Sequence, residues 1–181
     1  GSIVTVLIAG ISTIFYDLQK MTAEPLLQYK DGGKMVELPA LGQYSFDLFL
    51  SHAQDLGQDQ VATIKASLEQ LLPSIKIFLD VESLDDLHSL DELVFRSRSV
   101  LVFLTAGCLR RYFVRKEVEA AAKKKTNIIA VQETDDRHGH CSLDEHRLDC
   151  PATAIEALFD SKHGVIMWFR AKAYKFIAVK Q

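Results

Sequence analysis

Acidic side chains crowd the segment "FLDVESLDDLHSLDELVFRS" at residues 78–97, where they follow an apolar run. The first four of these acids are Asp80, Glu82, Asp85 and Asp86. Residues at the carboxyl end of a buried strand lie where ligands bind in parallel sheets, but acidic stretches also solvate turns and cap helices. The sequence therefore offers two interpretations of this segment, a ligand site and the start of a helix.

Glu117 is another acid whose position could serve chemistry. On a helical wheel of residues 113–125, the apolar face consists of Val114, Val118, Ala121 and Ala122. Glu117 lies at the border of this face, one turn after Phe113 and early in the helix, where the helix dipole favours a carboxylate. It could reach a cleft, or it could pair on the surface with Lys124 or Arg115. Geometry alone favours the surface pair, since such pairs are common.

Other kinds of site find little support in the chain. The loop "RHGHCSLDEHRLDC" (137–150) contains histidines and cysteines, which bind zinc, but their spacing matches no common zinc framework. The chain has no glycine-rich turn of the Rossmann kind, no P-loop and no G-x-S-x-G elbow. We therefore expect no bound metal and no resident cofactor.

The elements that would position these residues alternate regularly between strand and helix. Apolar runs predict strands at 44–50, 75–79, 99–105, 127–132 and 164–168. Helical periodicity predicts helices at 60–72, 90–97, 113–125, 151–159 and 170–180. The run at 99–105 is apolar almost throughout, which is typical of a strand covered on both faces. This alternation indicates a doubly wound parallel sheet, with ligands beyond the carboxyl ends of its strands.

The composition favours a reduced, cytoplasmic globular domain. Of the 181 residues 48% are hydrophobic, which is enough for a substantial core. The net charge of -3 argues against a broad nucleic-acid-binding surface. The three cysteines are an odd number without repeated spacing, so we expect free thiols rather than a disulfide framework.

We expect residues 1–42 to lie outside the main domain, which we place at 43–181. Gly1 and Ser2 resemble a cloning remnant, which indicates a fragment of a longer protein with further domains. The apolar run "IVTVLIAGISTIFY" (3–16) is shorter than the roughly 20 residues that span a bilayer, so no membrane attachment is expected. It is either a helix that packs on the domain or on a neighbour, or a linker remnant.

Three motifs, in the correct order, resemble the TIR (Toll/interleukin-1 receptor) family. "YSFDLFLSHAQD" (44–55) is similar to its first conserved box, and "IKIFLDVESL" (75–84) to its second strand and the start of its BB loop. "SVLVFLTAGCL" (99–109) is similar to its third strand. The resemblance covers about residues 43–181 and implies a flavodoxin-like sheet of five parallel strands flanked by helices.

Within the family, the nearest likeness is to the NAD+-cleaving branch, which includes an animal enzyme that drives axon degeneration. "FVRKEVE" (113–119) is similar to that enzyme's aromatic-V-H-K-E-I-V run. The resemblance implies that Glu117 is the catalytic glutamate and that Phe113 contacts the substrate. It also implies an NAD+ glycohydrolase or cyclase, with NAD+ as substrate. The product, ADP-ribose or a cyclic ADP-ribose, stays open.

The same resemblance assigns further residues to the substrate cleft. Ser51 and His52 match the residues at the end of the family's first strand. Asp80 is expected to face the same cleft and Leu84 to form an apolar wall. The rest of the acidic segment is then expected to face solvent or a second subunit (Asp85, Asp86) or to cap the next helix (Ser89 or Asp91).

The likeness also implies self-association, through a BB loop at about Val81 to Leu90. Two departures from the NAD+-cleaving pattern concern the substrate. The animal enzyme has arginines just after the serine of its first strand, where this chain has "HAQD", and its BB loop has a glycine that this chain lacks. The contacts to phosphate or ribose must therefore differ.

Two alternatives to an NAD+-cleaving enzyme remain. The chain could be a non-catalytic signalling adaptor of innate immunity that uses the same surfaces for TIR–TIR assembly, although TIR adaptors of animals usually lack this glutamate. It could also act on nucleic acid, as some plant members do, but the acidic charge balance disfavours that activity.

Overall fold

The predicted strands form one parallel sheet in the computed structural model, which describes residues 26–29, 33–79, 87–160 and 164–170. The strands are β1 (Phe46–His52), β2 (Ile77–Leu79), β3 (Ser97–Leu104), β4 (Asn127–Glu133) and β5 (Val165–Trp168). Their order is β2-β1-β3-β4-β5, and every neighbouring pair is parallel. This order is that of flavodoxin, which confirms the predicted fold class.

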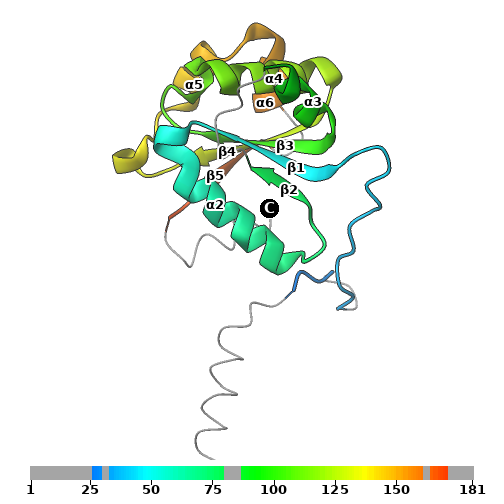
Figure 1. Cartoon of the computed structure of the whole chain (residues 1–181). Coiled ribbons are helices and arrows are strands. Elements are labelled where there is room, and N and C mark those ends of the chain that lie inside the picture. Colours follow the sequence, from blue (N-terminus) through cyan, green and yellow to red (C-terminus); the bar gives the residue numbers. More distant parts are fainter. Residues whose placement is uncertain (1–25, 30–32, 80–86, 161–163, 171–181) are drawn as a thin grey trace, which may run out of the picture.

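Helices cover both faces of the sheet (Figure 1). Helix α2 (Gln54–Leu71) packs on one face. The other face carries α3 (Leu87–Phe95), α4 (Tyr112–Lys124), α5 (Leu143–Asp149) and α6 (Ile155–Phe159). Successive side chains of a strand point to opposite faces, so Leu48 and Leu50 enter the core beneath α2, whereas Phe49 enters the core beneath α3 and α4.

Strand β3 lies at the centre of the sheet, as its apolar sequence predicts. Its residues from Val100 to Leu104 are all buried. Both core clusters draw on this strand, which explains why it lacks the alternation of a strand with one wet face. The carboxyl ends of β1 and β3 are paired neighbours, with His52 opposite Phe103.

Two helices begin earlier than predicted. Helix α2 begins at Gln54 rather than at residue 60. The apolar periodicity missed its first two turns because the residues buried there, Gly57 and Gln60, are not large apolar residues. Helix α3 begins at Leu87 rather than at residue 90. Ser89 and Asp91 therefore lie inside α3, and the prediction that one of them caps this helix is wrong.

The polar loop predicted for 133–150 contains a helix, α5. Ser142 caps it: its hydroxyl accepts from the backbone N–H of Glu145, whose carboxylate accepts from the backbone N–H of Ser142 at 2.8 Å. The S-x-x-E spacing of this capping box is visible in the sequence. The helix itself is short and charged, so its apolar periodicity is too weak to predict it.

Part of the segment before the domain contacts it. The backbone N–H of Leu27 donates to the carbonyl of Leu71 at 3.1 Å, and Arg98 donates to the carbonyls of Pro39 and Ala40. The apolar run at 3–16 and all but the first residue of the helix predicted for 170–180 lie outside the described residues. Within the described part, none of the helices has the length and apolarity needed to cross a membrane.

Candidate functional site

Ser51 and Glu117, which lie 66 residues apart in the sequence, form a buried pair. Ser51 is near the carboxyl end of β1, and Glu117 is in the second turn of α4. The Ser51 hydroxyl donates a hydrogen bond to Oε2 of Glu117. Ser51 is 1% and Glu117 5% exposed. A carboxylate in such surroundings needs hydrogen-bond donors, because an unpaired buried charge is costly.

The helical face explains why Glu117 is buried. The inward positions of α4 include Val114, Glu117, Val118 and Ala121, a spacing of three and four residues. The cations proposed as its surface partners bind elsewhere: Arg115 pairs with Glu119 at 3.2 Å, and Lys124 donates to the carbonyl of Phe95. Glu117 is thus more deeply placed than the border position predicted.

Phe113 lies one turn before Glu117 at the start of α4 and is 46% exposed. Its ring meets that of the exposed Tyr112 edge-on, with centroids 5.5 Å apart and planes at 81°. Two neighbouring exposed aromatic rings are a surface on which a planar ligand or another protein can pack. A flat ring could stack here one helical turn from the buried carboxylate.

The remaining predicted site residues divide into buried and undescribed ones. His52 is buried at the end of β1 and packs near Gly57, the first buried residue of α2. Asp80 and Leu84 lie outside the described residues, so their roles stay predictions. Leu90, the last residue of the contact loop predicted from Val81, is buried in the core as part of α3. The predicted end of this loop at Leu90 is therefore wrong, because Leu90 is a buried residue of a helix.

A second buried carboxylate, Glu133, ends β4 and was not singled out from the sequence. One oxygen accepts from the backbone N–H groups of Thr134 and Asp135, each at 2.9 Å. The other oxygen accepts a hydrogen bond from Nε of Arg170 at 3.0 Å, and Nη2 of the same guanidinium lies 2.8 Å away as part of the ion pair. Glu133 is fully buried, so removal of either partner would leave an uncompensated charge in the interior.

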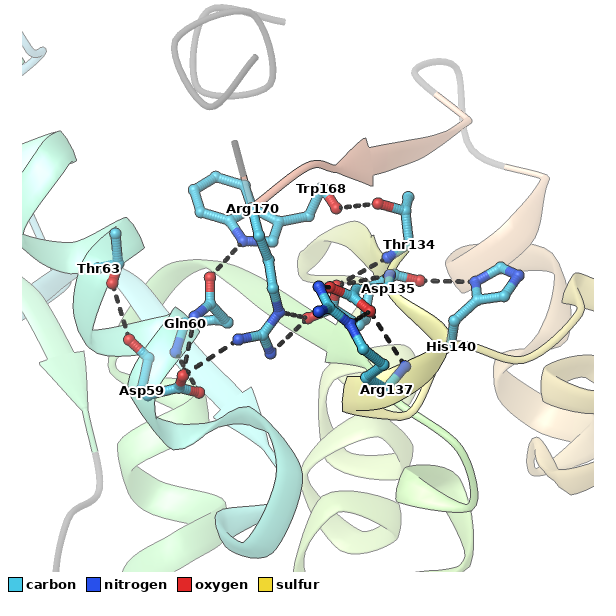
Figure 2. Close-up of polar contacts among 10 residues, drawn as sticks. Asp59, Gln60, Thr63, Thr134, Asp135, Arg137, His140, Trp168 and Arg170 are labelled. Carbon is cyan, nitrogen blue, oxygen red and sulfur yellow. Dashed lines mark hydrogen bonds and ion pairs between the residues drawn. The ribbon is translucent and has the colours of Figure 1, made fainter. Parts of the chain in front are cut away.

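Arg170 extends this network to α2. Figure 2 shows Arg170 between Asp59 and the residues that follow β4, and its Nη1 lies 3.3 Å from Oδ2 of Asp59. Beside it, the Trp168 indole donates to Gln60 at 2.9 Å. Trp168 and Arg170 therefore join the end of β5 to α2 and to the end of β4.

The cysteine–histidine loop places Cys141 beside His146, with Sγ 3.3 Å from Nε2. Burial raises the pKa of the Cys141 thiol and lowers the pKa of His146, so both groups are held neutral. A nucleophilic cysteine needs the opposite shifts. The three cysteines are free thiols, and the described ranges contain no group of three His, Cys, Asp or Glu side chains arranged to hold a metal.

An apolar cavity of about 350 Å³ lies on the α2 side of the sheet. Its walls include Leu48, Leu101, Val131 and Trp168. None of Ser51, His52, Phe113 or Glu117 lines it, so this cavity is separate from the buried pair.

Two residues at the same junction escaped the sequence analysis. Arg111, directly before α4, forms an ion pair with Asp55 in the first turn of α2. Each is unremarkable in the sequence, and a pair separated by 56 positions leaves no periodic signal. The pair joins the same two elements as Ser51 and Glu117.

Comparison with known proteins finds similarity only at the level of folds. No protein-family profile matches the chain, and no curated protein matches it. The TIR domains of the activated Roq1 resistosome that recognises the pathogen effector XopQ are 18% identical, with 61% of this chain covering 68% of that one at a TM-score of 0.45.

Two animal structures give comparable values. The TIR domain of the Toll-related receptor TRR-2 from Hydra magnipapillata is 14% identical, over 55% of this chain and 75% of that one, with a TM-score of 0.42. A TIR-STING receptor from C. gigas in complex with 2',3'-cGAMP is 15% identical, over 80% of this chain and 42% of that one, with a TM-score of 0.47. At these identities the likeness concerns the fold alone.

Proposed function

We propose that this chain is a TIR domain of the NAD+-cleaving kind, which breaks the nicotinamide–ribose bond of NAD+. The observation that carries the proposal is the buried Ser51–Glu117 pair one helical turn from the exposed Phe113. A glutamate that served only as part of a binding surface would not need to be buried or to accept a hydrogen bond from a serine, as Glu117 does. The sequence motifs that resemble the NAD+-cleaving branch imply a catalytic role for the same glutamate.

A single carboxylate suits this reaction. Cleavage of the C–N bond passes through an oxocarbenium-like state, as in glycoside hydrolysis. The bonding electron pair leaves with the nicotinamide nitrogen, which turns from cationic to neutral, so no general acid is required. Glu117 would hydrogen-bond the ribose hydroxyls and stabilise the positive charge that develops on the sugar.

The neighbouring residues would orient the carboxylate and the ring. Ser51 holds one oxygen of Glu117 through its hydroxyl, and Phe113 offers a face on which nicotinamide could stack. Capture of the cation by water forms ADP-ribose and releases a proton, whereas capture by an adenine nitrogen forms a cyclic product. Asp80 and Leu84 would complete the cleft.

We further propose that the activity depends on self-association in the cytoplasm. The BB loop, from about Val81 up to the start of α3 at Leu87, would contact a neighbouring subunit. Activity should then rise more steeply than linearly with protein concentration.

The test is nicotinamide release from NAD+ by wild type, Glu117→Gln and Glu119→Gln, measured by chromatography at low and high protein concentration. Glu119 is the matched control, because it lies on the same helix but pairs at the surface with Arg115. We expect release by wild type and Glu119→Gln, and at least about 100-fold less by Glu117→Gln.

The outcomes separate the proposal from its alternative. Equal release by wild type and Glu117→Gln would remove the catalytic role of Glu117. No release from wild type, even when it is demonstrably assembled, would leave an adaptor that acts through TIR–TIR contacts alone.

A further inference from the structure

We infer that Arg111 binds the diphosphate of the dinucleotide substrate, exchanging its present partner Asp55 for the substrate's phosphate oxygens. The inference rests on the proposed function and names the residue that recognises the charged part of NAD+. It starts from two bridges between the β1–α2 junction and α4: a buried one, Ser51 to Glu117, and an exposed one, Asp55 to Arg111.

The spacing of the two bridges suits a dinucleotide. Arg111 precedes Glu117 by six residues, which corresponds to about 9 Å along the axis of α4. In NAD+, the anomeric carbon of the nicotinamide ribose and the nearer phosphate are joined through the ring oxygen O4′, C4′, C5′ and O5′. A ribose held at Glu117 with its phosphates directed along α4 would bring them within reach of the long Arg111 side chain.

The chemistry of the exposed bridge also suits a phosphate. The side chains of Arg111 and Asp55 are 57% and 51% exposed, so their ion pair faces solvent. Exposed pairs of this kind contribute little to stability, so a ligand can replace this one at little cost. A guanidinium binds phosphate oxygens in the same forked geometry in which it binds a carboxylate.

Among the residues that the structure describes, Arg111 is the cation paired with the first turn of α2. The segment from Ser51 to Asp55 reads "SHAQD", without lysine or arginine. Arg110, the neighbour of Arg111, points instead to α5, where it pairs with Asp149 at 3.4 Å. Immediately after Arg111 stand the exposed rings of Tyr112 and Phe113. One turn of chain thus offers a cation and aromatic faces, the groups that a dinucleotide requires.

The experiment measures NAD+ binding by calorimetry and turnover by chromatography for wild type, Arg111→Ala and Arg110→Ala, with nicotinamide riboside as a second substrate that lacks phosphate. We expect Arg111→Ala to weaken NAD+ binding and raise KM about tenfold or more, since it removes a charge-assisted hydrogen bond. Its kcat, and turnover of the riboside, should equal those of wild type, as should all values for Arg110→Ala.

The matched variant Asp55→Asn should bind NAD+ more tightly, because it releases Arg111 and removes a negative charge beside the phosphates. Equal NAD+ affinity for wild type and Arg111→Ala would overturn the inference, as would an equal loss on the riboside or a wild type that does not bind NAD+. Failure of the proposed function gives a different result: binding that depends on Arg111 without any release of nicotinamide.

Discussion

Replacing Ser51 by alanine isolates the contribution of one buried hydrogen bond to the proposed reaction. The substitution removes the hydroxyl that donates to Oε2 of Glu117 and leaves the buried carboxylate with one donor fewer. Because Ser51 is 1% exposed, we expect it to act through Glu117 rather than by touching the substrate.

The magnitude follows from the chemistry of the bond. Hydrogen bonds to charged groups contribute about 1.5–3 kcal/mol. If this energy holds the carboxylate in its productive orientation, its loss lowers kcat by about 10- to 150-fold, since each 1.36 kcal/mol is a factor of ten. KM should change less than about twofold, because the lost contact is not made to the substrate.

The assay is steady-state release of nicotinamide, with thermal unfolding recorded for each variant. Ser51→Thr restores a hydroxyl and should recover much of the rate. Ser99→Ala is the control, since it removes a strand hydroxyl that contacts Asn127. In a double-mutant cycle, Ser51→Ala should have little further effect once Glu117 is glutamine.

Two results would refute this reasoning. A raised KM with unchanged kcat would mean that Ser51 contacts the substrate directly. An equally reduced rate in Ser51→Thr and Ser51→Ala, with both variants folded, would mean that the hydroxyl is not the group that matters.

Two further predictions concern stability. Glu133→Ala leaves Arg170 beside an emptied buried site and should lower the free energy of unfolding by about 3–5 kcal/mol. Asp59→Asn, at the exposed end of the network, should lower it by less than about 1 kcal/mol. Similar values for the two variants in urea unfolding would contradict the structural role of Glu133. Burial lowers the pKa of His146. The imidazole therefore takes up a proton near pH 6.5 in the unfolded chain but only at lower pH in the folded chain. The free energy of unfolding should be at its full value above about pH 6.5 and decline below it. His146→Phe should decline less between pH 7 and pH 5, and identical slopes would show that His146 does not titrate in this way.

Local patterns were sufficient to predict the layers of the fold. The apolar run of β3 identifies a central strand because a strand covered on both faces has no polar side to display. The alternation of strands and helices then leaves few topologies, since parallel strands need crossover helices. Element boundaries were harder, because the first two turns of α2 bury Gly57 and Gln60 rather than large apolar residues.

The candidate site was predictable only in part. Glu117 and Phe113 were found through a local motif, with one helical turn between them. The sequence by itself determined the alternating elements, the strand ends at which chemistry could occur and the acid on α4. Only the tertiary structure decided that Glu117 is buried with Ser51, that Glu133 pairs with Arg170, and that Arg111 meets Asp55. The physical reason is that periodicity reports which face of an element is apolar, whereas a hydrogen bond between residues distant in sequence depends on how two elements pack.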